Sequence, residues 1–221
     1  PSARQVEQVL GETARRSLAV YLGLVHLTDD GKAAIPPPHI ERAVIPAIED
    51  DSLGHTVIVA PPGSAKTNTM IAACAWWLGT DSSQHIAYVC NSGPKAVERS
   101  LVVRDLVERH SMYRKVFPGV EPDKSRGWAQ DAWTLKRKNF TDKNPSFNAV
   151  GTSGDILGAR VHRFVFDDIA DDENMKTDLQ RKQLRLRLEQ TYLTRMDDPV
   201  RQRAIMIGTR WHEDDPIQWA I

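Results

Sequence analysis

The sequence predicts an α/β protein with a mainly parallel central sheet flanked by helices. Residues 55–60 (HTVIVA) and 85–90 (HIAYVC) are short apolar runs typical of buried strands, and each precedes a segment of helical composition. A third apolar run, 161–166 (VHRFVF), ends at a pair of aspartates. Because strands that alternate with helices usually pair in parallel, these observations predict a parallel sheet.

Length and composition favour one globular domain. The chain has 221 residues, of which 41% are hydrophobic and 26% charged, close to globular averages. Apolar residues at loosely helical spacing predict an amphipathic helix over 6–24, and the prolines at 36–38 end any helix before them. We expect residues 1–35 to form an N-terminal helical segment packed on the core, and residues 36–221 to form the core.

Each of the first two strands is followed by a predicted helix. Residues 65–78 have helical composition and come directly after a turn rich in proline and glycine. The second helix is expected to run to about residue 110, with Asn91 and Ser92 as candidate N-cap residues. The order is therefore strand, tight loop, helix, and then the same again.

The second half of the chain has weaker signals. Residues 118–130 are rich in proline, glycine and charge and indicate a loop, whereas 133–137 and 147–150 are candidate strands for antiparallel edge positions. A charged segment with apolar residues at helical spacing predicts a helix over 175–192. A fourth buried strand is expected at 204–207.

The segment 60–67 (APPGSAKT) lies between a predicted strand and a predicted helix, which is where a phosphate-binding Walker A loop belongs. In such a loop, backbone N–H groups and the helix dipole attract phosphate oxygens. Alanines stand at both glycine positions of the usual motif, Ala60 and Ala65, and Gly63 remains as the flexible residue. The candidate nucleotide-binding residues are Pro62, Gly63, Ser64, Ala65, Lys66 and Thr67.

Two of these residues have specific roles in this interpretation. Lys66 is expected to reach the β- and γ-phosphates, and the Thr67 hydroxyl to bind Mg²⁺. The alternative is an ordinary strand-to-helix turn. A lysine in the first helical turn meets the positive end of the helix dipole, however, and a nearby anion would explain its position.

The third strand supplies two acidic residues at its end. Asp167 is the candidate Walker B residue, which would hold Mg²⁺ through water, and Asp168 is the candidate catalytic acid that orients or deprotonates the attacking water. The alternative is a pair of N-cap carboxylates before the next helix. The combination with a phosphate loop about one hundred residues upstream favours the functional interpretation.

The fourth strand also ends in polar residues. Gly208 and Thr209 are candidate coupling residues that would respond to the γ-phosphate and transmit its loss to the rest of the domain; the alternative is a turn with a threonine cap. The following residues, 212–215 (HEDD), are all of types that can bind metal ions. Neighbouring residues on one turn rarely converge on one ion, so we favour a solvated turn.

Charge, cysteine content and the length of the apolar runs limit the partners and the location that the sequence predicts. The chain has 29 basic and 29 acidic residues, so any nucleic-acid contact must come from a local patch, such as 136–138 or the set Arg181, Lys182, Arg185 and Arg187. Cys74 and Cys90 lie in apolar runs and are expected to be reduced core thiols. Residues 71–78 are too few to span a membrane, and we expect a soluble, cytoplasmic protein.

Three segments together resemble the N-terminal ATPase domain of phage terminase large subunits, the motors that package DNA into capsids. They are 60–67 (APPGSAKT), 158–169 (GARVHRFVFDDI) and 206–215 (MIGTRWHEDD), and the resemblance extends from about residue 36 to residue 221. Helicases and other P-loop ATPases share the first two. The third is the most specific.

The resemblance implies a P-loop NTPase fold of the additional-strand (RecA-like) class. It also implies hydrolysis of ATP with Mg²⁺, coupled to translocation of double-stranded DNA into a procapsid in the cytoplasm of the infected bacterial host. The expected partners are the portal protein, the small terminase subunit and further copies in a ring, although the isolated domain could be a monomer. Members carry a C-terminal nuclease domain, expected beyond residue 221, so no DNA cleavage is expected from this chain.

An arginine finger is expected because charge that develops on the γ-phosphate needs a cation. Some relatives have an arginine at the position of Leu157, next to Gly158, so that role would lie elsewhere here. Arg160 is the first candidate, acting in cis or from a neighbouring subunit. Three other functions stay open from the sequence: a helicase-like P-loop ATPase, a small-molecule kinase, and a nucleotide-binding assembly module that does not hydrolyse.

Overall fold

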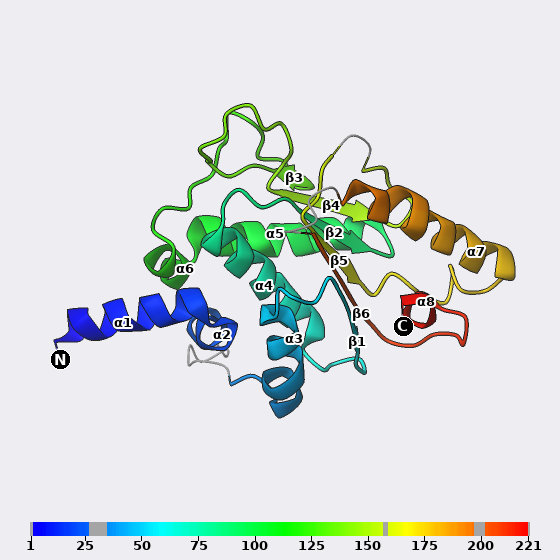
Figure 1. Cartoon of the computed structure of the whole chain (residues 1–221), viewed down its shortest axis with the longest axis horizontal. Coiled ribbons are helices and arrows are strands. Elements are labelled where there is room, and N and C mark those ends of the chain that lie inside the picture. Colours follow the sequence, from blue (N-terminus) through cyan, green and yellow to red (C-terminus); the bar gives the residue numbers. More distant parts are fainter. Residues whose placement is uncertain (1, 27–34, 157–158, 197–201, 221) are drawn as a thin grey trace.

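A computed structural model describes residues 2–26, 35–156, 159–196 and 202–220 (Figure 1). The strands are β1 (His55–Val59), β2 (Ile86–Cys90), β3 (Ala132–Trp133), β4 (Phe147–Gly151), β5 (Arg163–Asp167) and β6 (Arg203–Gly208). The helices are α1 (Ala3–Arg16), α2 (Leu18–Val25), α3 (Ile45–Glu49), α4 (Lys66–Thr80), α5 (Gly93–Arg109), α6 (Ser111–Val116), α7 (Asp178–Arg187) and α8 (Pro216–Ala220). Shorter helical turns are η1 (Ile40–Val44), η2 (Leu188–Tyr192) and η3 (Leu193–Arg195).

The six strands form one sheet in the order β1-β6-β5-β2-β4-β3, and every neighbouring pair is parallel except β3 with β4. The predicted α/β architecture with a mainly parallel sheet flanked by helices is confirmed. The register pairs Asp167 with both Cys90 and Ile207, and Val59 with Gly208. The carboxyl ends of β1, β6, β5 and β2 therefore meet at one edge of the sheet, where ligands bind in open α/β sheets.

Alternating side chains divide the core between the two faces of the sheet. On one face, Tyr88 and Val165 belong to the larger hydrophobic cluster, which α2, α3, α4, α5 and α6 cover. On the other face, Phe164 and Phe166 pack against Tyr192 of η2. Asp167 lies two residues after Val165, so the alternation turns its side chain toward the face that carries α4 and α5.

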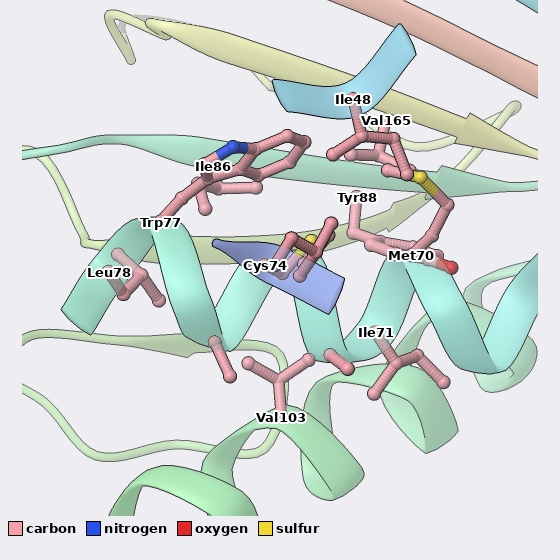
Figure 2. Close-up of a cluster of buried hydrophobic side chains, with 14 of the residues drawn as sticks. Ile48, Met70, Ile71, Cys74, Trp77, Leu78, Ile86, Tyr88, Val103 and Val165 are labelled. Atoms are coloured by element: carbon pink, nitrogen blue, oxygen red, sulfur yellow. The ribbon is translucent and has the colours of Figure 1, made fainter. Parts of the chain in front are cut away.

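Helix α4 lies between the sheet and α5. Figure 2 shows Trp77 and Met70 of α4 pointing toward Ile86 and Val165 of the strands, with Val103 of α5 on the opposite side of the helix. Because α4 is buried on both sides, most of its residues are apolar around the whole circumference. This packing fixes the position of its first turn relative to the strand ends.

The N-terminal segment forms two helices where the sequence predicted one over 6–24. Ser17 has an extended backbone between α1 and α2, and its hydroxyl accepts a hydrogen bond from the Val20 N–H, which caps α2. Leu18 and Tyr21 of α2 are fully buried in the larger cluster. The break turns the apolar residues of α2 onto the core, and α1 extends toward one end of the molecule (Figure 1).

Three further expectations need correction. The segment 147–150 is an interior parallel strand, and the antiparallel edge is only Ala132–Trp133. Residues 135–137 are not part of the sheet; Leu135 instead forms an isolated antiparallel bridge with Pro122, and the Lys136 N–H donates to the Glu121 carbonyl. The helix predicted over 175–192 begins at Asp178, where Thr177 and Gln180 form a capping box, and it changes to the π-helical η2 at Leu188.

Both cysteines are free and buried, as expected. Burial raises the pKa of both thiols, that of Cys90 to about 12. No helix in the described ranges has the length and apolar character needed to cross a membrane.

A buried polar cluster lies at the amino ends of β2 and β5. His85 Nε2 is 2.7 Å from an oxygen of Asp142 and 2.7 Å from Nη1 of Arg137, and the His85 ring stacks on His162 with centroids 4.4 Å apart. Burial, His162 and Arg137 lower the pKa of His85 to about 4, although Asp142 acts in the opposite direction. His85 is therefore neutral in the folded protein at neutral pH.

We expect the free energy of unfolding to decrease as the pH falls from about 6.5 through about 4. In this window the unfolded chain binds a proton at His85 and the folded chain does not. The measurement is urea denaturation across that range. His85→Gln should reduce the slope and His55→Gln, at an exposed position, should not; equal slopes for both variants would contradict this assignment.

Candidate functional site

The 60–65 loop connects β1 to α4 at the carboxyl edge of the sheet. Gly63 has φ of 75°, and Ala65, the N-cap of α4, has φ of 63°. Left-handed backbone costs a residue with a side chain roughly 1–2 kcal/mol, so the loop keeps at Ala65 a conformation that glycine adopts freely.

Hydrogen bonds hold the loop at both ends. The Ala60 N–H donates to the Gly208 carbonyl at 3.1 Å, and the Thr209 hydroxyl donates to the Ala60 carbonyl at 3.2 Å. His39 Nε2 lies 2.9 Å from the Ser64 carbonyl oxygen. The candidate coupling residues, Gly208 and Thr209, thus bind directly to the first residue of the loop.

Lys66 is the first residue of α4 and is buried, with 5% of its surface exposed. Its Nζ atom lies 3.6 Å from Oδ2 of Asp168. A buried ammonium at the positive end of a helix dipole requires a negative partner. The carboxylate of Asp168 provides one, and its side chain is 46% exposed, so a second anion can reach the same place.

Asp167 is 3% exposed and is held by three neighbours. Its Oδ1 accepts a hydrogen bond from the Thr67 hydroxyl at 3.0 Å, its Oδ2 accepts one from the Tyr88 hydroxyl at 2.8 Å, and Arg99 Nε is 3.9 Å from Oδ2. Burial raises the pKa of the Asp167 carboxyl, and Tyr88, Thr67 and Arg99 act in the opposite direction.

Asp168 leaves the strand in the left-handed region, with φ of 45°. Its N–H still donates to the Ile207 carbonyl at 3.0 Å, so the backbone is fixed while the side chain turns toward Lys66. Its Oδ1 is buried without a hydrogen-bond partner. Strained backbone with an unsatisfied carboxylate oxygen is common where a residue serves a ligand.

The structure therefore brings together four of the predicted site residues, namely Lys66, Thr67, Asp167 and Asp168. Sequence reasoning missed two further neighbours of Asp167. Tyr88 lies two residues before the end of β2, and Arg99 lies on the helix that follows it. No local pattern singled them out, because they reach Asp167 only through the pairing of β2 with β5.

Arg160 is not brought to the site within this chain. It precedes β5, so it lies at the amino end of the strand whose carboxyl end carries Asp167. It is exposed, and its N–H donates to Oδ1 of Asn144 at 2.9 Å. Five strand residues span about 16 Å, which exceeds the reach of an arginine side chain. Leu157 and Gly158 lie outside the described residues.

The turn at 212–215 is more ordered than expected. Asp215 is fully buried, and its carboxylate accepts hydrogen bonds from Arg210 Nε at 3.1 Å and from the N–H groups of Trp211 and Gln218. The expectation of a solvated turn is wrong for Asp215, which orders the start of α8. Within the described ranges, no group of three or more His, Cys, Asp or Glu side chains has metal-binding geometry.

The two candidate basic patches are largely occupied by internal contacts. Lys136 pairs with Glu121 at 2.6 Å, and Arg137 is buried beside Asp142. On α7, Arg181 is buried and contacts two aspartates, whereas Arg185 pairs with Glu189 and stacks on a tryptophan. Lys138 and Lys182 are exposed, and a phosphate-binding role for either patch stays a prediction.

The side chains of Lys66, Thr67 and Asp167 are of the kinds that bind a magnesium nucleotide. Mg²⁺ in nucleotide sites uses one or two protein oxygens together with phosphates and waters, and Thr67 and Asp167 offer such oxygens side by side. Lys66 and the first N–H groups of α4 suit phosphate oxygens. A cavity of about 670 Å³ is lined by residues of β1, by 60–64 of the loop and by His39, and Lys66, Thr67, Asp167 and Asp168 are not among its lining residues.

Comparison of the sequence with protein-family models and with curated protein sequences finds no match.

Proposed function

We propose that the chain is an ATPase motor domain of a phage terminase large subunit, with a P-loop NTPase fold of the additional-strand class. The observation that carries the ATPase part is that two pairs of residues from distant segments meet. Thr67 contacts Asp167, which lies one hundred residues later in the sequence, and Lys66 contacts Asp168. The position of β6 between β1 and β5 supports the additional-strand class. In that class one strand separates the strand before the phosphate loop, here β1, from the strand that ends in the Walker B aspartate, here β5.

The roles of the residues follow from their positions. Lys66 and the N–H groups of the 60–65 loop would bind the β- and γ-phosphates of ATP, with Pro62, Gly63, Ser64 and Ala65 supplying the loop backbone. Mg²⁺, held by Thr67 and through water by Asp167, would neutralise phosphate charge.

Asp168 would accept a proton from the attacking water, because its carboxylate is partly exposed and lies beside Lys66. Departure of the γ-phosphate would leave Lys66 and Asp168 to pair again, as they do at 3.6 Å here. The hydrogen bond from Thr209 to the loop offers a route by which that change reaches β6.

The terminase assignment rests on the resemblance of the three segments, and the third of them includes Gly208 and Thr209. The terminase assignment adds double-stranded DNA to the proposal as the translocated polymer. It also adds the portal protein and the small terminase subunit as partners, and a ring of copies on a procapsid in the infected bacterium. ATP and Mg²⁺ are the proposed substrate and cofactor.

The test is ATP binding and phosphate release by the purified chain, with and without double-stranded DNA. Lys66→Ala should weaken MgATP binding by at least about tenfold, because it removes the cation nearest the phosphates. Lys182→Ala, at an exposed position of α7, is the matched control. Absence of nucleotide binding by the wild-type chain would reject the proposal.

Two other results would replace the hydrolysis proposal. Binding of ATP without turnover, even with DNA and partner subunits present, would indicate an assembly module. Turnover only in the presence of a phosphate acceptor would indicate a small-molecule kinase.

A further inference from the structure

Arg99 lies on the second turn of α5. Its guanidinium Nε faces Asp167, the first residue of the acidic pair Asp167 and Asp168. Its Nε is 3.9 Å from Oδ2 of Asp167, and its Nη1 is 3.0 Å from Oε1 of Glu98. The side chain is 27% exposed, so it is neither sealed in the core nor free in solvent. Helix α5 follows β2, and β2 pairs with β5, which places Arg99 beside the end of β5.

The contacts of Arg99 leave hydrogen-bonding capacity unused. Its Nε atom is buried and has no acceptor. The Asp167 oxygen that it faces already accepts a hydrogen bond from Tyr88, and at 3.9 Å the contact is an ion pair without a hydrogen bond. An unsatisfied buried donor favours an added acceptor, and a phosphate oxygen is a strong one for a guanidinium.

Arg210, the other arginine near this edge, is differently placed. Its Nε donates to Asp215 at 3.1 Å, and its Nη2 donates to the carbonyls of His212 and Glu213. These contacts hold Arg210 in the turn before α8. Among the described residues, Arg99 is the only arginine with a side-chain nitrogen within 4.0 Å of a carboxylate oxygen of Asp167 or Asp168.

We propose that Arg99 contacts the γ-phosphate of ATP bound to the same chain and stabilises its charge during hydrolysis. This assignment rests on the proposed ATPase function. In that reaction the water oxygen forms a bond to the γ-phosphorus, the bond from that phosphorus to the β,γ-bridging oxygen breaks, and the water proton passes to Asp168. ADP leaves with the bridging oxygen, and Arg99 binds the oxygens of the transferred group.

The first test compares two equilibrium affinities by titration calorimetry. MgADP with aluminium fluoride imitates the transferred phosphoryl group, whereas MgADP alone lacks it. Arg99→Met should weaken the aluminium fluoride complex by roughly 10²-fold and change MgADP affinity by less than about threefold, and kcat should fall by at least about 10²-fold. Arg99→Lys should recover part of the lost affinity for the aluminium fluoride complex and part of the lost kcat.

Arg109→Met is the matched control, because Arg109 is on the same helix with a side chain 72% exposed. Unchanged aluminium fluoride affinity and kcat in Arg99→Met would overturn the proposal. Equal loss of both affinities, with a lower melting temperature, would also overturn it, because Arg99 would then support only the fold. Failure of the wild-type chain to bind MgADP would instead reject the proposed function.

The second test separates action in cis from action in trans. Arg99→Met and Asp168→Asn subunits are mixed under conditions in which the wild-type chain is active. If Arg99 acts in its own chain, no mixture recovers turnover, because each active site lacks one of the two groups. Recovery of turnover in the mixture would overturn the assignment in cis.

Discussion

Asp168→Asn is expected to lower kcat for ATP hydrolysis by roughly 10³-fold, while MgATP affinity changes little. Asparagine keeps the shape of aspartate but cannot accept the proton of the attacking water. The side chain is partly exposed and its backbone N–H is fixed to the Ile207 carbonyl, so the substitution should leave the strand end in place. Steady-state phosphate release and calorimetric binding measure the two parameters separately.

Asp172→Asn is the control, because Asp172 is exposed four residues later in the same acidic segment. Its kinetic constants should match those of the wild-type chain. If Asp168→Asn kept its full turnover, another group would have to receive the proton, and the pairing with Lys66 would have only a structural role.

Trp77→Ala is expected to reduce the free energy of unfolding by about 3–5 kcal/mol, the usual cost of truncating a buried aromatic side chain. Trp77 is 2% exposed, and the Arg163 guanidinium lies 4.7 Å from the centroid of its ring. Figure 2 shows the ring beside Ile86, between α4 and the sheet. Truncation would remove apolar contacts with both layers and a cation–π contact at once.

Urea denaturation followed by circular dichroism measures this loss. Trp211→Ala, at a position that is 51% exposed, should change stability by less than about 0.5 kcal/mol. A loss below about 1 kcal/mol for Trp77→Ala would mean that the surrounding side chains close the cavity, and that α4 is less tightly held than its burial indicates.

The local pattern of the sequence was sufficient for the α/β architecture. Apolar runs of four to six residues identified β1, β2, β5 and β6, and the runs of β2, β5 and β6 are mostly apolar because these parallel strands are buried on both faces of the sheet. The aspartates that follow the third run identified Asp167 and Asp168, and the loop pattern at 60–67 between a strand and a helix identified Lys66 and Thr67. A charged residue directly after a buried strand is at the edge of the sheet.

Strand order could not be read in this way. Tyr88 and Arg99 approach Asp167 because β2 pairs with β5, and Thr209 approaches Ala60 because β6 pairs with β1. Both pairings join segments far apart in the chain, and hydrophobic periodicity contains no information about which strands are neighbours. Arg160 is a different case, because it lies before β5 and Asp167 lies at its end, so the length of that single strand already separates them.

The two buried thiols have a practical consequence for fluorescent labelling of this protein. Maleimide dyes react with exposed thiolates, whereas burial of Cys74 and Cys90 keeps both groups protonated and enclosed. A fluorophore could therefore be attached at one cysteine introduced on the surface, such as on α7, without first removing the native pair. Energy transfer from that dye to a labelled nucleotide would then test the proposed binding and release of nucleotide in single molecules.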